Sequence, residues 1–258
     1  MNKVIRSNER GLTDLGWLKS YHSFSFGEYY SPENKGFRSL RVINDDYVEA
    51  GSGFDFHPHR DMEILTMVLN GAVTHIDSMG NSEIIKAGEF QLMSAGTGVL
   101  HSEYNLGDEE LRLLQIWIKP REKGLKPSYQ QKSLEQLPFD DTGFRVIASG
   151  FTGSGSDSTD ASCLKINQDI EIKLRSNLEA ESMSFTLGSE YNNAEQNSFD
   201  KKSFMGSYFH VIEGAVDIEL AGSPLVKLSP GDGFNLENAE EIKLLFEPMT
   251  KCLIFCFV

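Results

Sequence analysis

The chain alternates short apolar runs with turn residues, and this pattern predicts an all-β fold. Residues 21–26 alternate polar and apolar side chains, as a strand with one buried face does. Short, closely spaced β-rich runs bounded by glycine and asparagine indicate a sandwich or a barrel. The segment 129–137 is the best candidate for a short helix. The other predicted strands include residues 40–45, 63–69, 72–77, 89–94, 111–118 and 252–258.

A repeat with a constant offset relates the two halves of the chain. The stretch VLNGAV at 68–73 matches VIEGAV at 211–216, an offset of 214 − 71 = 143 residues. The same offset carries KAGEF at 86–90 onto SPGDG at 229–233, so that glycine falls on glycine in both places. Each copy thus has a strand, a Gly-Ala-Val hairpin and a Gly-acid turn in the same order. We therefore predict two copies of one β-barrel in tandem.

The connection between the two copies is expected in the segment 119–141, which is rich in lysine, proline and glutamine. The predicted domains are residues 1–132 and 133–258. The tract 151–162 is more polar still, and a strand-like run lies on either side of it. We interpret this tract as a mobile loop inside the second copy. The alternative is that the domain boundary lies in the tract itself.

Composition and charge narrow the classes of function. The residues are 40% hydrophobic, which is enough for a packed core, and no run of 18 apolar residues predicts a membrane-spanning helix. The opening MNKVIRSNERGL has no apolar core of a secretory signal, so we expect a cytoplasmic protein. Lysine and arginine number 24 against 38 acidic residues, giving a net charge of −14. This balance disfavours direct binding to nucleic-acid phosphates.

The three cysteines do not form a pattern typical of disulfides. Cys252 and Cys256 lie on one predicted strand, where four residues separate them by roughly 13 Å, which is too far for a disulfide. Cys163 has no neighbouring cysteine in the sequence. We therefore expect three reduced, buried thiols.

Four candidate metal ligands form two pairs with the same spacing. His57 and His59 lie in FDFHPHRDMEI, and His101 and Glu103 lie in GTGVLHSEYN. Residues i and i+2 of a strand project from the same face, so each pair presents two ligand groups in one direction. Three neutral imidazoles and one carboxylate suit a divalent metal such as iron, nickel, manganese, copper or cobalt, as well as zinc. The spacing thus predicts a metal site in the first copy.

The repeat provides a chemical control for this site. Shifted by the same offset of 143 residues, the four candidate ligands fall on Asp200, Lys202, Leu244 and Phe246. The second copy therefore lacks an equivalent donor set, and we predict one metal ion per chain.

The remaining histidines and one glutamate are left outside the ligand set. His22, His75 and His210 are interpreted as ordinary polar or surface residues. Glu63 shares parity with the first histidine pair, but along a straight strand it would lie roughly 13 Å beyond His59. It would reach the metal only if the chain turned just before it. A carboxylate there could instead orient a histidine or pair with a cation.

These residues resemble the cupin superfamily and, within it, the pirin family. GSGFDFHPH is similar to the Gly-x5-His-x-His opening of cupins, and HSEYN resembles their closing motif. FHPHRDMEILTMVLNG, AGEFQLMSAGTGVLHSEYN and LLQIWI resemble pirins assigned quercetin 2,3-dioxygenase activity, over roughly residues 5 to 130. The stretch SAGTGVLH departs from the general cupin pattern because it has no proline before its glycine. The carboxylate ligand also moves from the first motif to Glu103.

The resemblance implies two tandem cupin-type barrels of the double-stranded β-helix, or jelly-roll, kind. It implies that His57, His59, His101 and Glu103 bind one metal, usually iron as Fe(2+), and that the second barrel has none. It also implies a dioxygenase that opens the ring of a flavonol such as quercetin with O2 and releases carbon monoxide. By analogy with other cupin quercetinases, Glu103 would take the proton of the flavonol hydroxyl. Phe24, Phe26, Phe54, Phe56 and Met93 are candidates for apolar walls.

Two other functions stay open on the sequence alone. Proteins that resemble pirin also act as iron-dependent regulators through protein–protein contacts, in which the oxidation state of the metal changes a surface. A metal-stabilised bicupin without activity is the third interpretation. We expect a monomer, with a protein partner only in the regulatory case.

Overall fold

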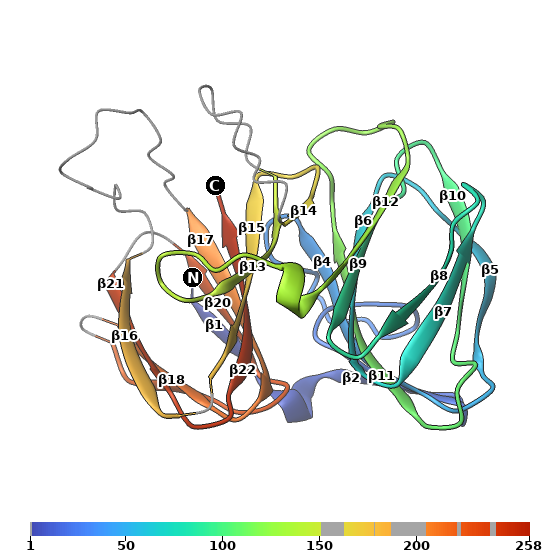
Figure 1. Ribbon diagram of the computed structural model, residues 1–258. Coiled ribbons are helices and arrows are strands. Elements are labelled where there is room, and N and C mark those ends of the chain that lie inside the picture. The colour runs from blue at the N-terminus through green and yellow to red at the C-terminus, as the bar shows by residue number, and fades with distance from the viewer. Residues whose placement is uncertain (1, 151–162, 178, 187–204, 221–222, 238–240) are drawn as a thin grey trace, which may run out of the picture. The chain divides into compact units, whose positions relative to one another are not determined.

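The computed structural model describes all residues except 1, 151–162, 178, 187–204, 221–222 and 238–240. The described residues cluster into two compact units (Figure 1). The first unit consists of Arg10–Leu137 and Ser162–Gln168, and the second of the described parts of Met1–Glu9, Pro138–Ala161 and Asp169–Val258. The tract 151–162, predicted as a mobile loop, lies outside the described residues. A boundary after residue 132 would place residues 2–9 in the first unit and residues 163–168 in the second. Residues 2–9 instead cluster with the second unit, and residues 163–168 with the first.

The first unit contains two antiparallel sheets. A seven-stranded sheet has the order β12-β9-β6-β11-β4-β3-β2, and a four-stranded sheet has the order β5-β10-β7-β8. The larger sheet consists of β2 (Gly11–Asp14), β3 (Leu18–His22), β4 (Leu40–Val48), β6 (Glu63–Asn70), β9 (Glu89–Ser94), β11 (Leu111–Ile118) and β12 (Ser128–Ser133). The smaller sheet consists of β5 (Gly53–His59), β7 (Ala72–Asp77), β8 (Ser82–Lys86) and β10 (Val99–Tyr104). The two-residue strand β14 (Leu164–Lys165) also lies in this unit, where the backbone of Lys165 bonds the side chain of Gln130.

The second unit repeats this arrangement. Its larger sheet contains the neighbouring strands β1, β20, β17, β22, β15 and β13, and its smaller sheet has the order β16-β21-β18-β19. The bounds in the larger sheet are β1 (Lys3–Ile5), β13 (Arg145–Ser149), β15 (Ile170–Ser176), β17 (Gly206–Glu213), β20 (Gly233–Glu237) and β22 (Lys251–Phe257). Those in the smaller sheet are β16 (Glu181–Thr186), β18 (Val216–Leu220), β19 (Val226–Leu228) and β21 (Glu241–Phe246). β1 belongs here because Lys3, Val4 and Ile5 pair with β20.

The all-β prediction is confirmed, and the predicted helix at 129–137 is wrong. The described helical elements are the single 3-10 turns η1 (Ser7–Glu9) and η2 (Leu134–Gln136). Residues 128–133 instead form β12, which pairs with β9 along its whole length. The side chain of Gln131 also donates hydrogen bonds to the Ile84 carbonyl and to Glu89. Pairing with a sheet edge thus overrides the weak helical preference of this polar segment.

The turns of the sequence repeat are also turns of the structure. Gly71 and Gly214 both adopt a left-handed backbone, with φ of 74° and 69°. Gly88 and Gly231 both have φ of 82°. Glycine occupies these four positions because other residues rarely adopt positive φ. The hairpins β6–β7 and β17–β18 therefore turn in the same way.

The sequence offset fails at one strand of the second unit. The strand beside β21 is β16, which takes the place that β5 occupies beside β10. In this register Leu244 pairs with Met183, whereas its counterpart His101 pairs with His57. Met183 rather than Asp200 is therefore the structural counterpart of His57. Asp200 and Lys202, to which the constant offset points, lie outside the described residues.

Each unit has an apolar core between its two sheets. In the second unit the core includes Phe209, Phe234 and Ile254 from the larger sheet and Ile218 and Leu244 from the smaller one. In the first unit, Val68, Leu111 and Leu113 of the larger sheet pack with Val73 and Ile85 of the smaller one. No helix among the described residues is long and apolar enough to cross a membrane.

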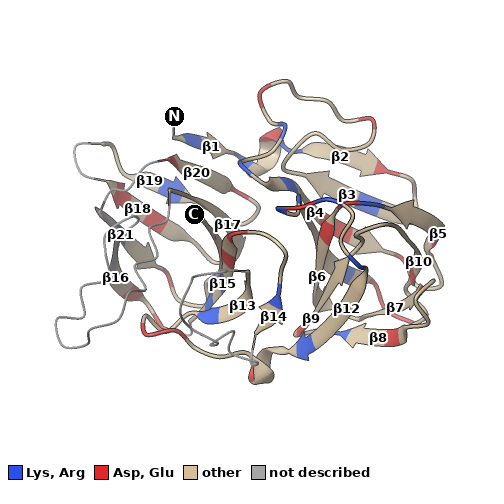
Figure 2. Cartoon of the chain, turned by 90° about the horizontal axis from the view of Figure 1, so that it is seen from above, with Lys and Arg blue, Asp and Glu red and all other residues tan. Residues whose placement is uncertain are grey.

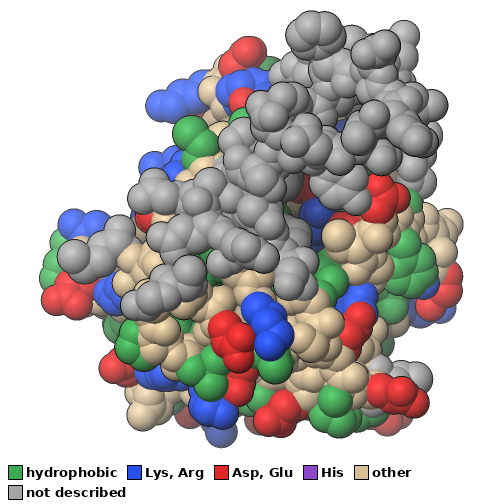
Figure 3. Space-filling view, turned by 90° about the vertical axis from the view of Figure 1, so that its left-hand side faces the viewer, with side chains coloured by type: hydrophobic (Ala, Val, Ile, Leu, Met, Phe, Trp, Pro, Cys, Tyr) green, Lys and Arg blue, Asp and Glu red, His purple; other side chains and the backbone are tan. Residues whose placement is uncertain are grey.

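The burial of the three cysteines agrees with the sequence expectation. Cys163, Cys252 and Cys256 are buried and form no disulfide, and burial raises the pKa of Cys252 and of Cys256 to about 12. Acidic and basic residues are interspersed on the strands of both units (Figure 2). Figure 3 shows the same mixture on one face, where apolar, acidic and basic side chains lie among other side chains and backbone, and no histidine of the described residues is visible.

Gly53 provides a test of the contact between β5 and β10. A Cβ atom there would lie 2.6 Å from the Tyr104 Cα and would also clash with the Glu103 carbonyl oxygen. Both atoms belong to the backbone of β10, which cannot move aside without breaking the strand pair. We expect Gly53→Ala to lower the free energy of unfolding by roughly 2–3 kcal/mol, the upper part of the range for overpacking, as measured by urea denaturation.

Gly51 is the matched control. It has φ of 74° and no atom within 4 Å of an added Cβ, so Gly51→Ala introduces backbone strain without a clash. We expect a cost of about 1 kcal/mol for this strain. Equal unfolding midpoints for the two variants would contradict the close approach of β5 to β10.

Candidate metal centre

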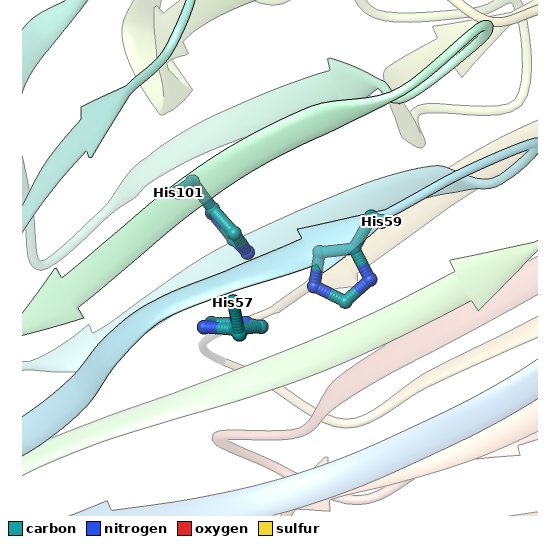
Figure 4. Close-up of side chains that lie close together, drawn as sticks. All are labelled: His57, His59 and His101. Atoms are coloured by element: carbon teal, nitrogen blue, oxygen red, sulfur yellow. The ribbon is translucent and has the colours of Figure 1, made fainter.

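Three of the predicted ligands meet between β5 and β10. His57 and His59 project from β5, and His101 projects from the neighbouring β10 (Figure 4). The register pairs His101 with His57 and Val99 with His59. The ring centroid of His57 lies 4.4 Å from that of His101 and 4.9 Å from that of His59, and His59 and His101 are 4.8 Å apart. One nitrogen from each ring lies within 4.8 Å of the others, a spacing that a single metal ion could bridge.

Hydrogen bonds indicate which ring nitrogens are available. The Nδ1 atom of His57 lies 2.7 Å from the carbonyl oxygen of Asp55, which can only accept, so Nδ1 carries the proton and Nε2 has the lone pair. The Nδ1 atom of His101 lies 3.3 Å from Nδ1 of His75. The Nε2 atom of His101 is buried and has no hydrogen-bond partner among the described residues. An orphaned nitrogen in this position fits a metal ligand.

Burial keeps two of the imidazoles neutral. Desolvation, assisted by the neighbouring histidines, lowers the pKa of His59 to about 4 and the pKa of His101 to about 3. Both rings therefore carry no charge near neutral pH and keep a lone pair. Neutral imidazole is the form that binds a metal ion.

Glu103 lies beside this cluster and is held by one of its two oxygens. It forms a second, overlapping group with His75 and His101, in which the donor atoms also lie within 4.8 Å of one another. The side-chain amide of Gln115 donates a hydrogen bond of 3.0 Å to the Glu103 Oε2 atom. Oε1 is buried without a hydrogen-bond partner among the described groups. His101 therefore belongs to both groups of candidate ligands, and it is the residue that links Glu103 to His57 and His59.

Glu63 is absent from both groups of candidate ligands. It opens β6 in the other sheet, after a turn in which Asp61 adopts a φ of 51°. Its buried carboxylate accepts a 2.7 Å hydrogen bond from the Ser94 hydroxyl and further hydrogen bonds from the backbone and side-chain amides of Asn167. Glu63 therefore anchors the segment 162–168 within the first unit.

For the other histidines, interpreted as polar or surface residues, the structure excludes a surface position because all three are buried. His22, His75 and His210 have at most 1% of their surface exposed. His22 is held by Asn44 and Thr13, and burial lowers its pKa. His75 contacts a predicted ligand directly, which parity along a single strand could not reveal.

Sequence reasoning missed two residues of β11. Gln115 holds Glu103, and the ring of Trp117 lies edge-on to His59 with centroids 4.8 Å apart. Both belong to the alternating run LRLLQIWI, where their shared parity was visible. That β11 faces the ligand strands follows only from the three-dimensional pairing.

The apolar residues proposed as walls divide into three kinds. Phe26 packs against Trp117 at 5.3 Å, whereas the ring centroid of Phe54 lies 6.3 Å from that of the predicted ligand His57. Phe24 and Met93 are fully buried in the core, and Phe56 is 59% exposed. Phe54 packs edge-on against Trp17 at 5.3 Å. Trp117 is therefore the aromatic residue beside His59, and Phe26 packs on Trp117.

Negative charge accumulates around the cluster. Burial, together with the charges of Asp45 and Glu103, raises the pKa of Asp46 to about 7, although a hydrogen bond from Ser20 lowers it. The carboxylates therefore repel one another where the imidazoles are neutral. A bound cation would relieve this repulsion, so the donor set and its electrostatics fit a divalent metal ion.

The comparisons with known proteins place the whole chain among relatives of known family. The Pirin family model matches residues 4–118. A quercetin 2,3-dioxygenase of Escherichia coli (strain K12) is 41% identical over 251 residues, which cover 97% of this chain and 96% of that protein. The crystal structure of YhhW from Escherichia coli has a TM-score of 0.82 and 41% identity, over 100% of this chain and 98% of that one.

A further solved structure contains a metal. The bacterial pirin YhhW from Escherichia coli, in complex with nickel(II), has a TM-score of 0.82 and 40% identity, over 100% of this chain and 99% of that one. These neighbours confirm the predicted fold class of two tandem cupin-type barrels. Because identity extends over nearly the whole chain and the fold is shared, this protein belongs to the pirin family.

Proposed function

We propose that the protein is a metal-dependent dioxygenase of the quercetinase type, which opens the ring of a flavonol with O2 and releases carbon monoxide. The observation that carries the proposal is the convergence of three imidazoles beside a carboxylate, with His101 Nε2 and Glu103 Oε1 both buried and unpartnered among the described residues. His57, His59, His101 and Glu103 would hold one divalent ion, with Fe(2+) as the first candidate. The names of its relatives support this reaction and substrate class.

A bound divalent metal would supply Lewis-acid activation of the flavonol 3-hydroxyl and a position at which O2 is oriented against the ring. The chain's own residues have distinct parts in this scheme. Glu103, once loosened from the metal, would take the hydroxyl proton on Oε1, the oxygen that Gln115 does not bond. Phe26 and Trp117 would form an apolar wall beside His59 for a flat aromatic substrate.

A second candidate function is regulation through protein contacts, with the metal as a redox sensor. It is favoured by apolar side chains on the outer face of the sheet that bears the ligands. The side chains in question are between 41% and 59% exposed and alternate along their strands with inward-facing residues; they are Phe56, Ile76, Ile84 and Leu100. Turnover of quercetin separates the two functions, because a regulator needs none.

The ligand assignment predicts metal binding by the first unit only. Wild-type protein should bind close to one divalent ion per chain, measured by elemental analysis after gel filtration. His57→Ala and His101→Ala each remove a ligand nitrogen and should abolish tight binding.

The matched control is His210→Ala, which removes a buried histidine of the second unit. It should retain the metal. Two tight sites in the wild type, or loss of the metal from His210→Ala, would contradict the assignment.

Glu103→Gln tests whether the carboxylate is a ligand, a base or both. Glutamine keeps the size and one acceptor oxygen but loses the charge and the basicity. If Glu103 is the base, the variant loaded with saturating Fe(II) should turn over quercetin roughly 10²–10⁴-fold more slowly, the scale of general-base catalysis. The measurement is the loss of the quercetin absorption band.

Glu63→Gln is the control for this prediction, since Glu63 bonds Ser94 and Asn167 outside the ligand cluster. Its metal-loaded turnover should stay near that of the wild type. Full activity of Glu103→Gln would leave Glu103 as a ligand only. Absence of turnover by metal-loaded wild type on quercetin and related flavonols would favour the regulatory function.

A further inference from the structure

A chain of hydrogen bonds runs from a carboxylate through one histidine to a proposed ligand. The Nε2 atom of His75 lies 3.3 Å from the Asp77 Oδ2 atom, and the His75 Nδ1 atom lies 3.3 Å from Nδ1 of His101. His75, Asp77 and His101 have 6% or less of their surface exposed. His75 and Asp77 lie on β7 and His101 on the adjacent β10.

The donors around Asp77 fix the direction of this chain. Its Oδ1 accepts hydrogen bonds from the backbone N–H groups of Met79 and Asn81 at 2.8 and 3.0 Å, and its Oδ2 accepts one from the Asn81 side chain at 2.8 Å. A carboxylate surrounded by three donors acts as an acceptor. His75 must therefore donate from Nε2 to Asp77 and accept at Nδ1. In the hydrogen bond between the two Nδ1 atoms, His101 is therefore the donor and carries the proton on its Nδ1.

We propose that Asp77 and His75 are positioning residues that fix His101 in the tautomer with the proton on Nδ1 and the lone pair on Nε2. This inference rests on the proposed metal site, toward which Nε2 would point. Carboxylate–histidine pairs behind a metal ligand orient its ring and increase its basicity. The opposite tautomer would direct an N–H group at His57 and His59 and exclude a cation.

His75 is itself a candidate ligand by distance, since it lies in a group with His101 and Glu103. Its hydrogen bonds argue against that role. Nε2 is directed to Asp77, and Nδ1 lies near both His101 and the side-chain amide of Gln91, at 3.3 and 3.4 Å. Neither nitrogen keeps a lone pair directed away from protein donors, so His75 acts on a ligand and does not replace one.

Asp77→Asn tests the proposal because it should reverse the whole chain. The new side-chain amide would donate to His75 Nε2, so His75 would carry its proton on Nδ1 and donate to His101 Nδ1. The His101 proton would then move to Nε2. Two-dimensional long-range ¹H–¹⁵N spectra of full-length, metal-free protein labelled in histidine report the protonated nitrogen directly. We expect Nδ1–H for His101 in the wild type and Nε2–H in Asp77→Asn.

Metal affinity supplies the second measurement, by competition titration with Ni(II) and a chelating dye. We expect Asp77→Asn to bind Ni(II) about 10–100-fold more weakly than wild type, the usual scale for a partner behind a ligand. His75→Phe keeps a ring against Tyr129, which packs on His75 at 5.2 Å, and should weaken binding similarly. The double variant should be no weaker than His75→Phe, because Asp77 acts through His75. His210→Phe, a buried histidine of the second unit, should bind as wild type.

The outcomes separate this inference from the proposed function. Wild type that binds no Ni(II) or Fe(II) would remove the metal site, whereas the spectra of metal-free protein would still report the tautomer. A His101 proton on Nε2 in wild type would overturn the inference without any variant. Folded Asp77→Asn that binds Ni(II) within about twofold of wild type, or additive losses in the double variant, would also overturn it.

Discussion

The pairing of β5 with β10 is the contact on which the site depends. His57 and His101 are 44 positions apart in the sequence. The antiparallel pairing of β5 with β10 places these two residues opposite each other. A strand alone presents His57 and His59 on one face, but it provides no third donor. The register shift between His101 and Glu103 then displaces the carboxylate from the histidine group toward His75. Small changes in the separation of these strands would therefore alter the distances from His101 to His57 and from His101 to His59 together.

The electrostatics of this cluster favour the binding of a cation. Burial makes His59 and His101 poor bases, so they do not neutralise the carboxylates around them. Asp46, whose pKa is raised to about 7, shows that the same interior disfavours further negative charge. A positive ion held by neutral nitrogens is the species that satisfies both conditions. Protonating the imidazoles instead would place several positive charges within one small cluster, which their low pKa values oppose.

Sequence patterns predicted the fold class, and they predicted that His57 and His59 share one face because strand parity is a local property. They also identified paired glycine turns, since Gly71 and Gly214 need the same left-handed backbone. They failed where the answer depends on which strands are neighbours. The sequence of residues 129–137 is polar and weakly helical, but its first part forms a strand because it pairs with the edge of β9. His75 looks ordinary until β7 lies beside β10, and the offset of 143 residues misplaces the counterpart of β5 because β16 occurs earlier in the second unit.

The second unit shows that this strand order does not require a polar interior. Beside β21, Met183 pairs with Leu244, and Leu244 and Phe246 belong to an apolar core. Apolar side chains are the less costly solution at such positions, because burying imidazoles and carboxylates requires hydrogen bonds or ligands to replace water. In the first unit Asp77, His75, Gln91 and Gln115 supply part of that replacement. His101 Nε2 and Glu103 Oε1 still have no partner among the described residues. The fold alone gives no reason to bury these two atoms without a hydrogen-bond partner, whereas a bound metal ion would provide the missing partner for both.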